Sequence, residues 1–108
     1  MIRAVLLDAA GTLISVVEPV GVSYARLAAP FGVTRAPEEI GRRFKAAIHT
    51  PWPGPRQRGD GRRFWRFVVA EATGSADPAL FEAAYAHFAK ASAWRVNPGV
   101  ADALSALR

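Results

Sequence analysis

Only one segment of this chain has the pattern of a β-strand, and every later segment has the pattern of a helix. Residues 4–7 are four consecutive apolar residues, which is typical of a strand buried on both faces of a parallel sheet. A lone strand leaves backbone donors and acceptors unpaired along both edges. The sequence therefore predicts that these 108 residues are the front part of a larger α/β protein, or that the strand pairs with another chain.

Prolines, acidic first turns and terminal glycines delimit five predicted helices after Leu13. Pro30 is expected to disturb the last turn of the first helix. The density of proline and glycine between residues 50 and 61 predicts a loop. The predicted helices cover residues 19–31, residues 37–49, residues 62–73, a segment from Asp77 through at least Phe88, and residues 97–108.

Asp8 follows the predicted strand directly and precedes a turn that contains Gly11 and Thr12. Ligands collect at the carboxyl ends of parallel strands, and an aspartate there can act as a nucleophile. Gly11 allows the chain to turn sharply, and the Thr12 hydroxyl can hold that turn in place. This arrangement is typical of a nucleophilic carboxylate presented at the edge of a sheet.

The sequence Asp-x-x-Gly-Thr-Leu after an apolar strand resembles the first motif of the haloacid-dehalogenase-like hydrolases. The resemblance covers the chain: residues 1–14 correspond to the first core strand and nucleophile turn, residues 15–95 to an inserted helical cap, and residues 96–108 to the start of a helix that returns to the core. Residues 61–69, together with the helix of Tyr24, are similar to the phosphatase-like subgroup of the rhythmically-expressed-gene type. The implied fold is a Rossmann-like core, represented by its first strand, with an α-helical cap that closes over the site.

The resemblance implies roles for four residues. Asp8 would be the nucleophile and a Mg²⁺ ligand, the main-chain carbonyl of Ala10 a second ligand, and Gly11 and Thr12 would contact the substrate. Mg²⁺ prefers hard oxygen ligands and would offset the repulsion between Asp8 and an anionic phosphate. The implied reaction is hydrolysis of a small phosphorylated metabolite through an aspartyl phosphate. The family's later motifs would lie beyond residue 108, so the 108 residues alone are expected to be inert.

Ala10 departs from the family pattern, because phosphatases of this kind carry a second aspartate there. Alanine can neither protonate a leaving alkoxide nor activate water, functions worth about 10²–10⁴ in rate. Several alternatives follow: a weak phosphatase, a hydrolase of activated substrates, or an inactive binding or regulatory relative. A haloacid dehalogenase is another, although these enzymes usually carry an aromatic residue there. A free-standing helical interaction module is the alternative outside the family.

Composition excludes some chemistry and leaves other partners open. The absence of cysteine excludes disulfides, thiol catalysis and cysteine-based zinc sites. No apolar run reaches the about 20 residues that span a bilayer, and no signal-peptide pattern is present, so a cytoplasmic location is expected. Twelve arginines dominate a net charge of +5. Arginines cluster with aromatic residues between Arg56 and Arg66. We interpret them as a solvated face or as cap residues near an anionic substrate, and we do not expect nucleic acid as a partner.

The remaining aromatic and histidine residues are predicted to be structural. The aromatic side chains of Phe44, Phe81, Tyr85 and Phe88 have helical spacing and are expected in the core of the bundle. His49 and His87 have no neighbour at metal-ligand spacing, so we expect them at the surface or in packing contacts.

Overall fold

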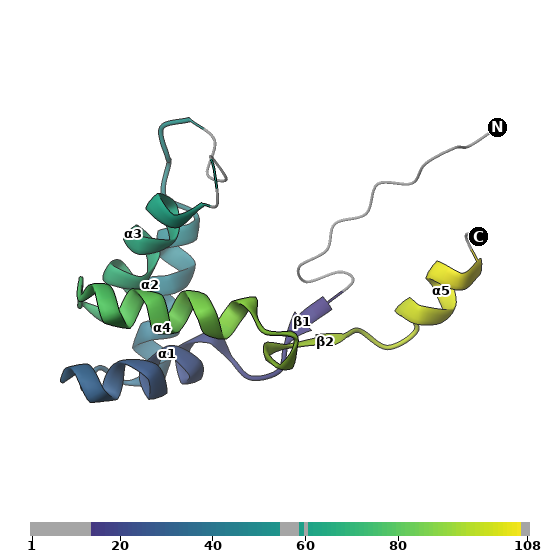
Figure 1. Cartoon of the computed structure of the whole chain (residues 1–108), viewed down its shortest axis with the longest axis horizontal. Helices are drawn as coiled ribbons and strands as arrows, with labels where there is room; N and C mark the ends of the chain where they lie inside the picture. The colour runs from purple at the N-terminus through teal and green to yellow at the C-terminus, as the bar shows by residue number, and fades with distance from the viewer. Residues whose placement is uncertain (1–13, 55–58, 60, 107–108) are drawn as a thin grey trace.

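The computed structural model describes residues 14–54, 59 and 61–106 (Figure 1). This part of the chain is mixed α/β and mostly helical, with five α-helices and a two-stranded antiparallel sheet. The predicted strand at residues 4–7 lies outside the described residues, so the Rossmann-like core stays a prediction. In chain order the elements are β1 (Ile14–Val16), α1 (Val20–Ala28), the 3₁₀-helix η1 (Ala29–Phe31), α2 (Pro37–Ile48), α3 (Arg62–Thr73), α4 (Pro78–Ala89), the 3₁₀-helix η2 (Ala91–Ala93), β2 (Trp94–Val96) and α5 (Val100–Ala106).

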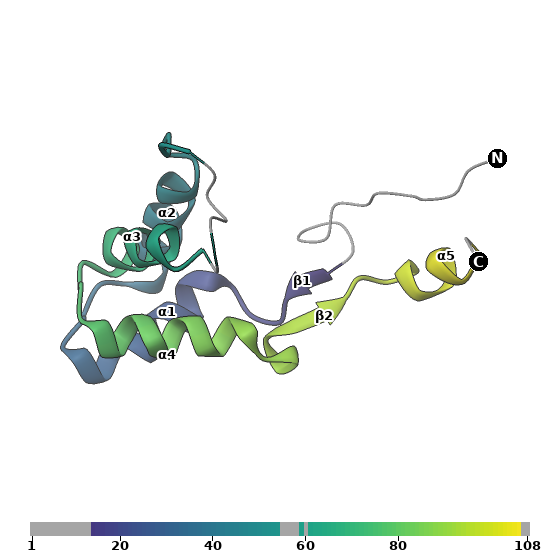
Figure 2. The ribbon, with the colours of Figure 1, turned by 45° about the horizontal axis from the view of Figure 1, so that its top comes forward.

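β1 and β2 lie side by side at one end of the helical bundle (Figures 1 and 2). The expectation that no strand follows Leu13 is wrong. Each strand has only three residues, too few to show an alternating pattern, and each depends on a partner far along the chain. The antiparallel register places Ile14 opposite Val96, Ser15 opposite Arg95, and Val16 opposite Trp94.

The four helices α1 to α4 form the bundle, and their ends follow local sequence signals. The predicted disturbance at Pro30 is confirmed, because α1 ends at Ala28 and the chain continues as η1. Asp77 caps α4 by accepting a 2.9 Å hydrogen bond from the Ala79 amide. Gly74 ends α3 with a φ of 81°, in the left-handed region that favours glycine. The predicted bounds of α3 match the observed ones.

α1 and α2 cross at a pair of glycines. A Cβ atom on Gly21 would lie 2.1 Å from the carbonyl oxygen of Pro37 and 2.9 Å from the amide nitrogen of Gly41. Only a residue without a side chain allows this approach. A Cβ on Gly41 would meet nothing closer than the Gly21 Cα at 3.9 Å. Gly21 is therefore the residue that sets the closeness of the two helices.

A single guanidinium connects the loop before α2 to the end of α3. Arg35 donates hydrogen bonds to the carbonyl oxygens of Glu71, at 3.3 Å, and Ala72, at 2.9 Å. These carbonyls belong to the last turn of α3, where a cation is favoured and backbone acceptors lack helical partners. Arg35 thus holds the C-terminal end of α3 against the start of α2.

The core of the bundle consists of two clusters of buried apolar residues. The larger lies between α1, α2, α3 and α4, and the smaller lies between α2 and α3. Phe44 and Trp65 contact both clusters, so the two are continuous through these side chains. The buried members of the larger cluster are Tyr24, Ala28, Ile40, Val69, Ala72, Leu80, Phe81 and Ala84, and those of the smaller are Ala47, Phe64 and Val68.

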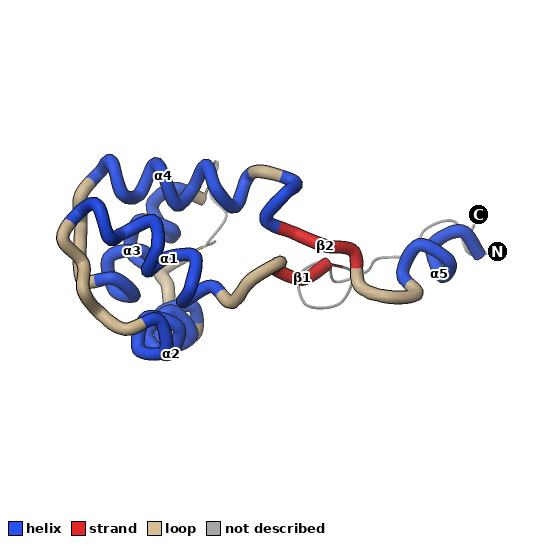
Figure 3. The backbone as a smooth tube through the Cα atoms, turned by 90° about the horizontal axis from the view of Figure 1, so that it is seen from below, coloured by secondary structure: helices blue, strands red, loops and turns tan. Residues whose placement is uncertain are grey.

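α5 lies beyond the strands and apart from the bundle (Figure 3). None of its residues is buried, and Leu104 is 40% exposed. The predicted start at residue 97 is wrong by three residues, because Asn97 and Gly99 provide the carbonyl oxygens that receive the first helical amides, those of Val100 and Ala103. Asn97 thus precedes the helix and does not belong to it.

Candidate functional site

The residues that the sequence assigns to catalysis lie outside the described residues. These are Asp8, Ala10, Gly11 and Thr12, all in the segment before β1. Within residues 14–54, 59 and 61–106, no group of three or more histidines or carboxylates gathers in a way that can hold a metal ion. The Mg²⁺ ligands expected from the sequence therefore stay a prediction, and the described part of the chain contains a site of a different kind.

A cavity of about 390 Å³ lies inside the bundle and reaches the two strands. Its size falls in the range of small-molecule pockets. Each of the four bundle helices contributes to its wall, and so do both strands. The aromatic part of the wall consists of Tyr24 from α1, Phe44 from α2, Trp65 from α3, Phe81, Tyr85 and Phe88 from α4, and Trp94 from β2.

Five of these rings form a continuous series of contacts from α3 to β2. Trp65 stacks on Phe44, with ring centroids 6.5 Å apart, and Phe44 meets Tyr24 edge-on at 5.6 Å. Tyr24 meets Phe88 at 5.8 Å, and Phe88 meets Trp94 at 6.2 Å. Edge-on and stacked pairs at these separations are favourable beyond the apolar area they bury. Each ring therefore holds its neighbour, which gives the cavity a fixed aromatic wall.

The wall is less buried than the sequence predicts. Phe81 is in the core as expected, at 4% exposed. Phe44, Tyr85 and Phe88 are only half-buried, because the cavity opens beside them. Trp65 of α3 is half-buried in the same way. Large apolar side chains that stay partly accessible around one hollow are typical of binding sites.

Tyr24 places a polar group in this apolar wall. The residue is 3% exposed, and burial raises the pKa of its hydroxyl well above the ordinary value, so the group is protonated at neutral pH. Among the described residues no hydrogen bond reaches that hydroxyl. Every fully buried side-chain nitrogen or oxygen atom in the described part has a partner, so the Tyr24 oxygen, which has none, must retain access to open space. Tyr24 is one of the residues that line the cavity.

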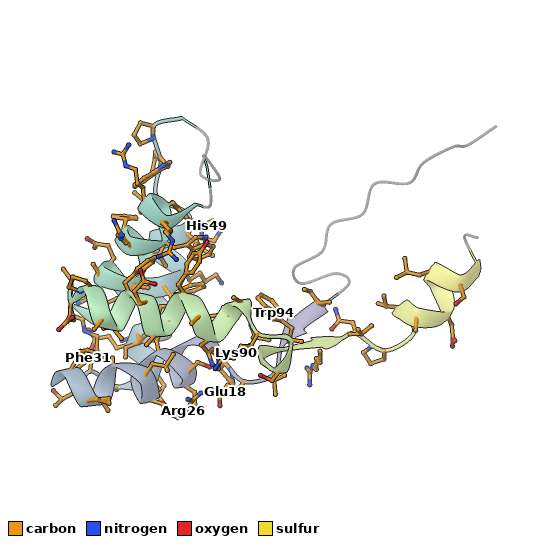
Figure 4. The ribbon with its side chains drawn as sticks, viewed as in Figure 1. Glu18, Arg26, Phe31, His49, Lys90 and Trp94 are labelled. Carbon is orange, nitrogen blue, oxygen red and sulfur yellow. The ribbon has the colours of Figure 1, made fainter. Side chains whose placement is uncertain are left out.

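Trp94, the first residue of β2, lines the cavity. Its indole N–H donates a 2.9 Å hydrogen bond to the Phe88 carbonyl oxygen. Figure 4 shows Trp94 beyond the end of α4, where β2 begins. Because this bond satisfies the only polar atom of the side chain, the ring presents apolar surface to the cavity. The orientation of the ring is thereby fixed from α4.

Two arginines of α3 contact aromatic rings of α4. The Arg62 guanidinium carbon lies 4.5 Å from the centre of the Tyr85 ring, and the same side chain pairs with Glu82. The Arg66 guanidinium carbon lies 5.2 Å from the centre of the Phe81 ring. Such cation–π contacts stabilise the packing of α3 on α4. Arg56 and Arg58 lie outside the described residues, and the remaining evidence for a nucleic-acid surface in this segment is only its charge.

The two histidines occupy the kinds of position that the sequence predicts. His49 is exposed, and its Nδ1 atom lies 2.7 Å from the Lys45 carbonyl oxygen at the end of α2. His87 packs edge-on against Phe88, with ring centroids 4.7 Å apart. These contacts are structural, and neither histidine takes part in a cluster of metal-binding side chains within the described chain.

Comparisons with known proteins add no family. No protein-family model matches the chain, and no curated protein sequence matches it. Among the described residues, no helix has the length and apolar character needed to cross a membrane.

The aromatic residues on the apolar helix faces are the sequence signal for the cavity. Helical spacing alone does not tell whether such residues line a cavity or form a packed core. Aromatic residues occur on the apolar faces of all four bundle helices, and spacing assigns each of them to the interior. Whether facing aromatic rings fill the interior or line a hollow depends on the distances between helices. Those distances are set by contacts such as the Gly21 crossing, which no single helix reveals.

Proposed function

We propose that this chain is the first strand, nucleophile turn and helical cap of a haloacid-dehalogenase-like phosphohydrolase. The observation that supports the proposal is the pairing of β1 with β2, which brings the entry and the exit of the helical bundle together. A module whose two ends meet can be inserted at one point of another fold without disturbing it. This is the arrangement expected of a cap placed between residues 1–14 and residues 96–108.

The proposed chemistry belongs to Asp8. Its carboxylate attacks the phosphorus of a phosphomonoester, a bond forms between the carboxylate oxygen and phosphorus, and the bond from phosphorus to the ester oxygen breaks. The leaving alkoxide takes its proton from water, because Ala10 has none to give. A water molecule then hydrolyses the aspartyl phosphate, which releases inorganic phosphate and restores Asp8. Gly11 and Thr12 would contact the phosphate, and bound Mg²⁺ would neutralise charge.

The proposed setting is a small phosphorylated metabolite as substrate, in the cytoplasm, without nucleic acid or membrane as partner. The reading frame that encodes these residues provides the direct test when it is expressed at its full natural length. Hydrolysis of 4-nitrophenyl phosphate with added Mg²⁺ should be abolished by Asp8→Asn and unchanged by Asp102→Asn, which alters an exposed carboxylate on α5. Activity that persists in Asp8→Asn would exclude the proposed nucleophile.

A second candidate is an inactive relative that binds a ligand without converting it. Ala10 favours this candidate, because it removes the residue that supplies acid and base help in the family. The same assay separates the two: an inactive relative shows no Mg²⁺-dependent phosphate release at full natural length. The cavity inside the bundle is compatible with both candidates, since binding through it requires no catalytic group.

A further inference from the structure

We propose that the cavity in the helical bundle binds a one- or two-ring aromatic group that carries a hydrogen-bond acceptor, with the Tyr24 hydroxyl as the donor. In the proposed phosphohydrolase this group is the organic part of the phosphoester, an identification that rests on the proposed function. The binding itself does not depend on it. The proposal thus assigns both a ligand class and the residue that discriminates within it.

The shape and lining of the cavity favour an aromatic group. Its volume of about 390 Å³ is enclosed by aliphatic and aromatic side chains from all four helices. The series of rings from Trp65 to Trp94 provides both faces and edges, the surfaces against which an aromatic ligand packs well. A strongly charged ligand would lose its hydration without gaining a partner at this wall, so the part of the ligand that enters is apolar.

The Tyr24 hydroxyl favours a ligand with an acceptor. Tyr24 belongs to an apolar wall, and its hydroxyl is protonated and has no hydrogen-bond partner among the described residues. A hydroxyl without a hydrogen-bond partner in an apolar environment is unfavourable, and an acceptor that receives a hydrogen bond from it removes this cost. A ligand oxygen within the cavity would satisfy it, whereas a pure hydrocarbon would leave it unpaired. Tyr24 should therefore distinguish two ligands of the same shape that differ by a single oxygen.

The cavity adjoins the strands that connect the bundle to the rest of the chain. Val16 of β1 and Trp94 of β2 belong to its wall. Asp8 precedes β1 in the sequence, so β1 connects the segment of the proposed nucleophile to a strand that lines the cavity.

The test uses 1-tetralone and tetralin, which have the same ring system and differ in one carbonyl oxygen. Binding to the 108-residue chain is followed by NMR through the indole N–H signals of its three tryptophans. Trp65 and Trp94 line the cavity, while Trp52 packs instead on Phe64 and Phe67 and serves as an internal reference. We expect both ligands to shift the Trp65 and Trp94 signals, 1-tetralone to bind more tightly, and the Trp52 signal to stay in place.

Variants locate the ligand and its hydrogen bond. Tyr24→Phe should weaken 1-tetralone binding by about 2- to 10-fold, the equivalent of one neutral hydrogen bond, and leave tetralin binding unchanged. Ala89→Trp places a bulky side chain at the exposed rim of the cavity and should abolish binding of both ligands. Ala86→Trp, at an exposed position on α4 outside the cavity, should have no effect. Circular dichroism confirms that each variant is folded.

Three results would overturn the proposal: no shift of Trp65 and Trp94, an equal shift of all three indoles, or unchanged discrimination between the ligands in Tyr24→Phe. The first result would also be obtained if another part of the chain already filled the cavity, and the proposal would be wrong in that case too. Failure of the phosphohydrolase proposal gives a different result. Hydrolysis would then persist in Asp8→Asn or be absent altogether, while both ligands would still shift the Trp65 and Trp94 signals.

Discussion

The Ser15 hydroxyl donates a 2.7 Å hydrogen bond to the side-chain oxygen of Asn97, joining residues 82 positions apart. Ser15 lies in β1, and Asn97 follows β2 directly. Next to this bond, Ser15 and Arg95 are partners in the strand register. Side-chain and backbone contacts therefore join the segment that enters the helical bundle to the segment that leaves it.

Removing this side-chain bond should loosen the closure. In urea unfolding, Ser15→Ala and Asn97→Ala should each lower the free energy of unfolding, and the double variant should cost less than the sum by about 0.5–1.5 kcal/mol, the net value of one hydrogen bond. Ser92→Ala, at an exposed position in η2, serves as the control and should change stability by less than about 0.5 kcal/mol. Strict additivity of the two variants would show that the bond does not contribute.

The glycine crossing gives a prediction with opposite signs at two positions. Gly21→Ala should lower the free energy of unfolding by roughly 1–3 kcal/mol, because the new Cβ meets the backbone of α2 and forces the helices apart. Gly41→Ala should be neutral or stabilising by up to about 1 kcal/mol, since its Cβ meets only ordinary contacts and alanine favours a helix interior. Thermal and urea unfolding of the two variants measure both effects.

The bounds of α3 and the starts of α2 and α4 could be predicted from sequence because their signals are local. Pro37 with its two acidic neighbours, the Asp77 cap and Gly74 act within one helical turn, so a single sequence contains all that they need. Pro30 likewise ends α1 through its own ring and missing amide hydrogen.

The strands and the cavity could not be predicted because they depend on residues distant in sequence. Ile14–Val16 becomes a strand only when Trp94–Val96 lies beside it. The position of Tyr24 on an apolar face is evident in the sequence, but the hollow beside it follows from how closely four helices approach. Asp8 and its turn, the residues with the strongest sequence signal for function, lie outside the described residues.

Arg35 should contribute to stability through the end of α3. Arg35→Ala removes hydrogen bonds to the Glu71 and Ala72 carbonyls and a favourable charge at a helix C-terminus. We expect a loss of about 1–2 kcal/mol, which is modest because the contact is partly exposed to solvent. Arg42→Ala removes the same charge from an exposed position on α2 and should change stability by less than about 0.5 kcal/mol. Equal effects of the two variants would assign the loss to net charge alone.

Protonation of Glu18 at acid pH should lower the stability of the fold at the start of α1. The Ser23 hydroxyl and the Arg26 guanidinium donate to the Glu18 carboxylate and lower its pKa below the ordinary value of 4.5 (Figure 4). Because the folded pKa lies below the unfolded one, the ionised group favours folding above pH 4.5, and that contribution is lost as the pH falls through the folded pKa. The melting temperature should therefore fall more steeply below pH 4.5 in the wild type than in Glu18→Gln.

An NMR titration of the Glu18 carboxyl carbon tests the cause directly. Ser23→Ala removes the largest contribution and should move the Glu18 pKa upward, toward its ordinary value. Arg26→Ala should move it in the same direction. An unchanged Glu18 pKa in both variants would contradict the assigned cause, whatever the melting curves show.

Restoring an acid at position 10 should reveal whether the Asp8 turn is catalytic. In the protein at its full natural length, Ala10→Asp supplies the group that can protonate the leaving oxygen and later activate water, help worth about 10²–10⁴ in rate. The gain should be largest for alkyl phosphates, whose leaving groups need a proton, and smallest for 4-nitrophenyl phosphate, whose leaving group needs none. Ala10→Asn has nearly the same size without the acid and should give no gain. An equal gain for both substrates would mean that Ala10→Asp acts on hydrolysis of the aspartyl phosphate, the step that the two substrates share, and not on protonation of the leaving group.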